Sequence, residues 1–251
     1  MSGVQENLNL KEYFEQVVQD ELKIFDEFIR WTDKDKREFE ELLTKLKSPF
    51  DKATETTKEK GDRLEKVVEF IIQKSFFLEI FKNIHTETNE IDEVIVFSNR
   101  GKQALHSFNI SRELIPIEEN IMLGECKNYS TNLGVTYVGK FYSLMTVSGV
   151  SFGILFTQNG LTGDAEGYKD AYGLTKVLRM IEKSREPGKE FFILTFTLED
   201  YEKLLQGYTF FELIKAKRLE MQFASDYNNF ISDNRHDAEN EIKKAISEII
   251  R

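Results

Sequence analysis

The chain has almost no cysteine, since Cys126 is the only one among its 251 residues. This excludes an internal disulfide and a cysteine-rich zinc site, and it fits a reducing compartment such as the cytoplasm. Histidine is also scarce. His85, His106 and His236 are scattered without metal-ligand spacing, which argues against zinc chemistry and against a catalytic triad.

Long apolar runs and an excess of basic residues are missing as well. No run approaches the roughly 20 apolar residues of a membrane-spanning helix, and the first ten residues are polar, unlike a signal peptide. We therefore expect a cytoplasmic protein without membrane contacts. The formal net charge is −10, so any attraction to nucleic-acid phosphate must be local. Hydrophobic residues make up 40% of the chain, which is enough for a sizeable core and excludes wholesale disorder.

We expect three regions: an N-terminal helical region, a core and a C-terminal helical region, at residues 1–60, 61–198 and 199–251. In the first, apolar residues at helical spacing predict two helices packed as an antiparallel hairpin. The polar segment at residues 51–61 marks its boundary with the core. In the third, an apolar stripe predicts a long C-terminal helix, Phe210–Ile250. Packing of these helices onto the core is the simplest expectation, and dimerisation is the alternative.

Within the core, the spacing of apolar residues changes from helical to strand-like and back. Residues 62–82 are expected to be a helix, and residues 99–101 a turn that leads to a short strand at 104–108. The other expected strands lie at 91–97, 121–127, 152–157 and 191–196, with helices at 137–147 and 165–183. Antiparallel pairs followed by β-α-β crossovers predict an α/β fold, with a mixed sheet covered on both faces by helices.

One stretch, Met122–Tyr129 (MLGECKNY), combines a buried strand with charged residues at its end. Alternate residues of a strand share a face, so Glu125 and Lys127 are expected to project side by side. Asp92 lies near the start of another apolar strand. A surface ion pair, worth little in stability, is the weaker explanation, because it does not account for charges at the end of so apolar a strand.

Asp92 followed by Glu125-x-Lys127 resembles the signature of the PD-(D/E)xK nuclease superfamily. The order of expected helices and strands also resembles its restriction-endonuclease-like core. The likeness is to the Mrr-type branch: residues 61–68 resemble its Gly-x-x-Phe-Glu opening, and residues 153–165 resemble its strand, turn and helix after the catalytic strand. Two features depart from the pattern: the long separation between Asp92 and Glu125, and the lack of the Gln-x-x-x-Tyr motif of RecB-like members.

The resemblance implies a metal-dependent endonuclease that hydrolyses DNA phosphodiester bonds, with a role in defence against foreign DNA. Mg²⁺ or Mn²⁺ would be held by Asp92, Glu125 and the backbone carbonyl of Cys126, since hard cations prefer oxygen ligands. Lys127 would orient the attacking water or stabilise the transition state. Glu65, on the first core helix, is a candidate fourth participant and metal ligand. A solvated helix carboxylate is an equally good interpretation of it.

Cutting both strands of a duplex usually takes two copies of a one-site nuclease, so a homodimer or a protein partner is expected. Two other functions stay open. A non-catalytic DNA- or protein-binding regulatory protein on the same fold would fit the acidic charge, and the motif does not exclude RNA or branched DNA as substrate. The presence of Asp92, Glu125 and Lys127 together favours the enzyme. The side chain of Cys126 is expected to point into the core as a small hydrophobic group.

Overall fold

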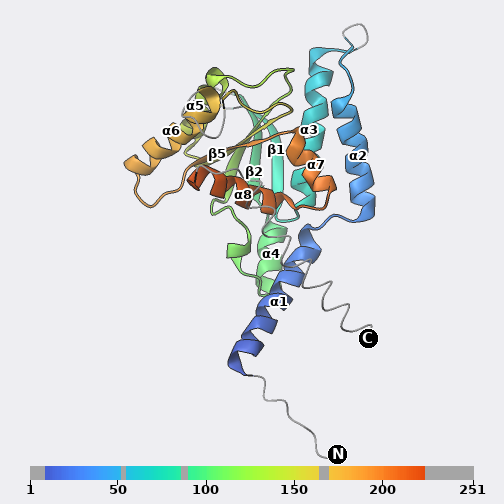
Figure 1. Ribbon diagram of the computed structural model, residues 1–251, viewed down its shortest axis with the longest axis vertical. Coiled ribbons are helices and arrows are strands. Elements are labelled where there is room, and N and C mark those ends of the chain that lie inside the picture. Colours follow the sequence, from blue (N-terminus) through green and yellow to red (C-terminus); the bar gives the residue numbers. More distant parts are fainter. Residues whose placement is uncertain (1–8, 52–54, 86–89, 164–169, 224–251) are drawn as a thin grey trace, which may run out of the picture.

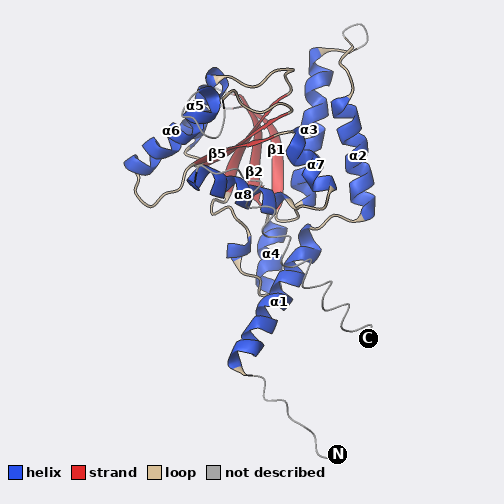
Figure 2. Ribbon diagram, in the orientation of Figure 1, coloured by secondary structure: helices blue, strands red, loops and turns tan. Residues whose placement is uncertain are grey.

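The computed structural model describes residues 9–51, 55–85, 90–163 and 170–223. Its centre is a five-stranded mixed sheet with the strand order β1-β2-β3-β4-β5, visible in Figure 2. The strands are β1 Leu78–His85, β2 Glu90–Phe97, β3 Ile121–Lys127, β4 Phe152–Thr157 and β5 Phe192–Phe196. Strand β2 is antiparallel to both β1 and β3, whereas β3, β4 and β5 are parallel. The protein is therefore mixed α/β, with helices flanking the sheet, as expected.

The helices of the described part lie on both faces of this sheet (Figure 1). In chain order they are α1 Leu10–Ile29, α2 Asp33–Lys47, α3 Thr57–Lys74, α4 Asn99–Ser107, α5 Val135–Ser148, α6 Asp170–Arg185, α7 Leu198–Leu205 and α8 Phe210–Phe223, with a short 3₁₀ helix at Arg112–Leu114. Within the described residues, no helix is both long enough and apolar enough to cross a membrane.

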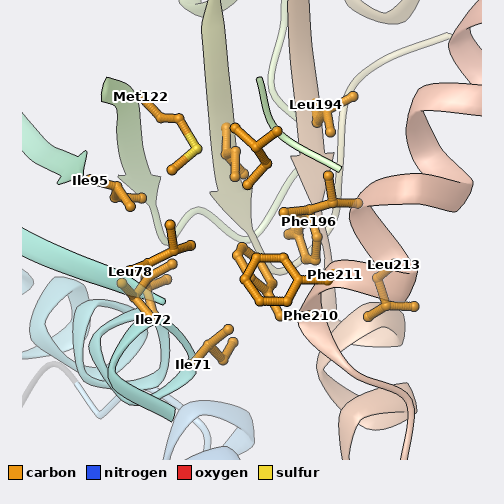
Figure 3. Packing of buried hydrophobic residues seen from close by; sticks show 14 of the residues in the cluster. Ile71, Ile72, Leu78, Ile95, Met122, Leu194, Phe196, Phe210, Phe211 and Leu213 are labelled. Atoms are coloured by element: carbon orange, nitrogen blue, oxygen red, sulfur yellow. The ribbon is translucent and has the colours of Figure 1, made fainter. Parts of the chain in front are cut away.

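Two clusters of buried side chains cover the two faces of the sheet. The larger joins the sheet to α3, α7 and α8, and Figure 3 shows Ile71, Phe196 and Phe210 among its members. The smaller joins the sheet to α5 and α6. Because strand residues alternate in direction, Met122 belongs to the larger cluster and Leu123 to the smaller one. We call these two surfaces the α3 face and the α5–α6 face.

The expected helix at residues 62–82 starts earlier than its stated bounds and is wrong at its C-terminal end. Helix α3 begins at Thr57, after a capping box between Thr56 and Glu59, and it ends at Lys74. It therefore starts inside the polar segment at 51–61. The chain then passes through Phe76, whose φ is 62°, and continues as strand β1. Residues 75–82 are apolar enough for a helix or a strand, and pairing with β2 decides in favour of a strand.

The expected turn and strand at residues 99–108 are also wrong, because these residues form helix α4. Ser98 is its N-cap and accepts a hydrogen bond from the backbone N–H of Gly101. A Cβ at Gly101 would lie 2.9 Å from the Cα of Phe77. Glycine is therefore required here for close packing of a helix and not for a turn between strands.

The two N-terminal helices do not pack together as the expected antiparallel hairpin. Helix α2 packs against α3, whereas α1 extends away from both (Figure 1). The C-terminal half of α1 packs onto the core, as expected, where the Phe25 ring stacks on Phe77 and lies near Phe211. At the other end of the chain, α8 is described as far as Phe223, and the rest of the expected helix to Ile250 lies outside the described residues. The same holds for the start of the helix expected at 165–183, whose described part begins at Asp170.

Candidate functional site

Strands β2 and β3 place three charged side chains at one end of the sheet. In the antiparallel register Glu93 pairs with Gly124, so the next residues, Asp92 and Glu125, lie opposite each other. Lys127 follows Glu125 by two residues and shares its face. The structure therefore brings together the three residues that resemble the nuclease signature, on the α5–α6 face.

The ammonium group of Lys127 lies between the two carboxylates. Its Nζ is 2.8 Å from Oδ2 of Asp92 and 2.7 Å from Oε1 of Glu125. All three side chains are partly buried, with 24% of Lys127, 30% of Asp92 and 20% of Glu125 exposed. Burial by itself lowers the pKa of Lys127, but hydrogen bonds to Asp92 and Glu125 outweigh it and raise the pKa above its usual value. Lys127 therefore stays charged at neutral pH.

The chemistry of this donor set fits a divalent cation. Two carboxylates and a backbone carbonyl are hard oxygen ligands of the kind that Mg²⁺ prefers. They already hold a positive charge between them, that of Lys127. Within the described ranges, no group of three or more His, Cys, Asp or Glu side chains is arranged as a metal-binding group. The expected set has two such side chains, Asp92 and Glu125, and its possible third, Glu65, lies near Lys82 instead, so a cation here would complete its coordination with main-chain, water or substrate oxygens.

Glu65 lies on α3 and pairs with a different lysine. Its Oε2 is 3.9 Å from Nζ of Lys82, which also lies 2.8 Å from Oε2 of Glu69. The negative charge of Glu65 contributes to raising the pKa of Glu93 and of Cys126. Glu65 is therefore near the residues of the α3 face, and its ion-pair partner is Lys82 instead of Lys127.

Glu93 is a notable residue that the sequence analysis missed. Its side chain is only 1% exposed, and its Oε2 has no hydrogen-bond partner among the described residues. Burial raises the pKa of this carboxyl to about 8, despite a hydrogen bond from the Cys126 thiol that lowers it; the negative charges of Asp92, Glu65 and Glu125 raise it further. The alternation of Glu93 with Ile95 and Phe97 places it in the inward register, which is the sequence signal that could have identified it.

Cys126 and Gly124 complete the surroundings of Glu93. Cys126 packs against the larger buried cluster, as strand alternation predicts, and burial raises the pKa of its thiol well above the ordinary value. The thiol is therefore protonated at neutral pH and is a poor nucleophile. A Cβ at Gly124 would lie 3.0 Å from Cβ and 3.3 Å from Oε2 of Glu93. The missing side chain at Gly124 leaves the space that the Glu93 carboxyl occupies.

Polar side chains tie together the loops that follow β3 and β4. The amide of Gln158 donates to Oδ1 of Asn128 at 2.7 Å and to the carbonyl of Leu46 at 3.2 Å. Asn128 in turn donates to the carbonyl of Lys60 at 2.5 Å. These bonds connect the end of the strand that carries Glu125 and Lys127 with the start of α3.

No protein-family model matches the chain, and neither a curated protein nor a solved structure matches it.

Proposed function

We propose that the protein is a metal-dependent endonuclease that hydrolyses DNA phosphodiester bonds, on a core of the restriction-endonuclease-like type and with an Mrr-like role in defence. The observation that carries the proposal is the position of the Lys127 ammonium, which contacts Asp92 from β2 and Glu125 from β3. Two carboxylates and one lysine at adjacent strand ends are the three functional groups of the PD-(D/E)xK signature.

The order of elements supports the same proposal. Helix α3 is followed by the antiparallel strands β1, β2 and β3, by helix α5 and then by β4, which is parallel to β3; α4 and the short 3₁₀ helix are inserted between β2 and β3. This helix, three-strand, helix, strand order is the core shared by the superfamily. The proposal places the functional groups where its signature has them, on the second and third strands.

Each residue has a defined role in this proposal. Asp92 and Glu125, with the backbone carbonyl of Cys126, would hold Mg²⁺ or Mn²⁺. The bound cation would activate a water molecule and stabilise the negative charge that develops on the phosphoryl group. Lys127 stays protonated beside them, because its hydrogen bonds to both carboxylates raise its pKa. An ammonium in this position orients the attacking water and stabilises the negative charge that develops on the phosphate. Glu65 stays a candidate for a supporting role.

The test is cleavage of supercoiled plasmid DNA in Mg²⁺ or Mn²⁺ by the full-length protein. Lys127→Ala and Asp92→Asn should each lower the rate by about 10²–10⁴-fold, the range that removal of one charged catalytic group typically costs. Lys102→Ala, which alters an exposed lysine on α4, is the matched control and should cleave at the wild-type rate.

Three results would contradict the proposal in different ways. Wild-type protein that is inactive with every divalent metal, on plasmid, branched DNA and RNA alike, would favour a non-catalytic binding or regulatory protein. Activity confined to RNA or branched DNA would keep the chemistry and change the substrate. Equal activity in the wild type, Lys127→Ala and Asp92→Asn would assign cleavage to another site or to a contaminant.

A further inference from the structure

The N-terminal half of α1 exposes a continuous apolar stripe. Its members recur every three or four residues and are between 41% and 80% exposed. They are Leu10, Tyr13, Phe14, Val17, Val18 and Leu22. Figure 1 shows this half of α1 extending away from the sheet. Contiguous apolar patches of this kind usually mark a binding surface.

The stripe leads into a cavity beside the start of the C-terminal segment. This cavity, of about 470 Å³, lies between α1, the chain around Leu114 and helix α8. Leu22 belongs both to the stripe and to the cavity wall, and Leu219 and Gln222 line the cavity from α8. The last described residue, Phe223, is 69% exposed. The chain therefore leaves α8 at the rim of the cavity into which the stripe opens.

We propose that residues 238–250 of the same chain bind along the stripe on α1. Their sequence, AENEIKKAISEII, has apolar residues at helical spacing. These residues are Ala238, Ile242, Ala245, Ile246, Ile249 and Ile250. Residues 224–237 connect this segment to α8, and an extended chain spans roughly 3.3 Å per residue. The connection is long enough to reach any part of α1, and the segment is about as long as the stripe.

Charge favours this segment over a second copy of α1. Acidic residues outnumber basic ones by six to two on α1, whereas residues 238–250 have three acidic and two basic residues and so carry less negative charge. Two copies of α1 packed together would place acidic side chains against one another, which is unfavourable. At helical spacing Lys243 lies beside the apolar residues of the C-terminal segment, where it suits the acidic edges of α1.

Disulfide cross-linking in the full-length protein tests the contact directly. Val17 lies near the middle of the stripe and Ile246 near the middle of the segment, so the pair Val17→Cys and Ile246→Cys should meet whichever way the segment runs. We expect a disulfide within one chain under mild oxidation. The control pairs Ile246→Cys with Gln19→Cys, which lies on the opposite side of α1, and should form at least tenfold more slowly. Disulfide-linked dimers, or equal rates for the two pairs, would overturn the proposal.

Amide hydrogen exchange gives a second test without added cysteines. Ile246→Asp should speed exchange of the amides in residues 13–22 by about tenfold or more, because burying one isoleucine is worth at least one tenfold step in an equilibrium. Ser247→Asp adds the same charge on the other side of the segment and should leave exchange unchanged. If all three proteins exchange alike in α1, the segment does not bind there.

Discussion

The neighbouring residues Asp92 and Glu93 show two ways in which one strand accommodates a carboxyl group. On the α5–α6 face, Asp92 and Glu125 share the Lys127 ammonium, and all three groups are paired. On the α3 face, Glu93 is almost fully buried beside the Cys126 thiol, and its Oε2 has no hydrogen-bond partner in the part of the chain that the structure describes. In the first arrangement, the positive charge of Lys127 compensates the negative charges of the two carboxylates. The second keeps its carboxyl neutral over much of the accessible pH range.

This difference bears on function because burial and charge pairing place different demands on a site. A group of paired charges keeps its charged form at neutral pH and is ready to hold a cation or a phosphate. An unpaired buried carboxyl costs stability once it ionises. The α5–α6 face therefore has the paired charges that the proposed site needs, and the stability cost of the Glu93 carboxyl on the α3 face should be measurable as pH rises.

Replacing Glu93 by glutamine should give the largest effect, and its size should depend on pH. The pKa of Glu93 is about 8 in the folded protein, above its ordinary value of 4.5, so folding takes up a proton between these values. The stability due to Glu93 is fully present below about pH 4.5 and is lost as pH rises toward 8. We expect the free energy of unfolding of the wild type to fall by about 3–5 kcal/mol over this pH range because of Glu93, since one pKa unit corresponds to about 1.4 kcal/mol. Glu93→Gln should not show this fall.

The measurement is the free energy of unfolding in urea, from pH 5 to pH 8.5, for the wild type and Glu93→Gln. The other titrating groups affect both proteins, so the difference between the two curves isolates Glu93. The free energy of unfolding of Glu93→Gln should increase relative to that of the wild type as pH rises. Parallel curves would mean that Glu93 ionises in the folded protein as freely as in the unfolded chain.

Removing the lysine of the paired group should cost somewhat less. Lys127→Met leaves Asp92 and Glu125 facing each other without the shared ammonium. Loss of one member of a buried pair costs about 3–5 kcal/mol, and partial exposure of these side chains reduces our expectation to about 2–4 kcal/mol. Denaturation of Lys127→Met, of Asp92→Asn and of the double variant measures the coupling.

The response of the same variants to Mg²⁺ tests whether a cation binds between Asp92 and Glu125. A divalent cation that binds the two carboxylates should raise the melting temperature of Lys127→Met more than that of Asp92→Asn, because only the former keeps both ligands. Lys82→Met is the control, since its partners Glu65 and Glu69 lie on α3. An equal response of all three variants to Mg²⁺ would indicate that the cation does not bind between Asp92 and Glu125.

Adding a methyl group beside Glu93 should have a smaller effect. Gly124→Ala would place its Cβ 3.0 Å from Cβ of Glu93, so we expect a loss of about 1–3 kcal/mol from overpacking. Gly139 on α5 has no atom within 4 Å of the corresponding position. Gly139→Ala should therefore stabilise the protein by about 0.5–1 kcal/mol, because alanine favours a helix. Urea denaturation of both variants checks the opposite signs, and a loss at Gly139 would contradict the packing argument.

Much of the sheet could be predicted from the sequence, because its central strands are apolar on both faces. Strands β2, β3, β4 and β5 lie within about one residue of their expected positions. The prediction failed where the same residues suit two structures, as at residues 75–82, and where glycine was interpreted as a turn, as at Gly101. The direction of α1 depends on contacts of Phe25 with distant rings, which no local pattern contains.

The residues of the candidate site could also be predicted from the sequence only in part. Asp92, Glu125 and Lys127 could be found because strand alternation and antiparallel pairing determine where such residues meet. Alternation with Ile95 and Phe97 places Glu93 on an apolar face of β2, but its almost complete burial depends on the larger cluster covering that face, which the strand pattern does not contain. The pairing of Lys82 with Glu65 could not be predicted either, because Lys82 lies on strand β1, for which the sequence pattern favours a helix.

Replacing Glu65 should have the smallest effect of these changes. It tests whether a carboxylate near the α3 face takes part in the proposed site on the α5–α6 face. Its ion pair with Lys82 is long and partly exposed, at 3.9 Å with 34% of Glu65 exposed, so Glu65→Gln should change stability by less than about 1 kcal/mol. Its effect on plasmid cleavage should be less than about tenfold, because its ion-pair partner belongs to the α3 face. Glu69→Gln removes the closer partner of Lys82 and serves as the matched control. A loss of cleavage in Glu65→Gln as large as in Asp92→Asn, with Glu69→Gln unaffected, would place Glu65 in the reactive site and end the separation of the two faces.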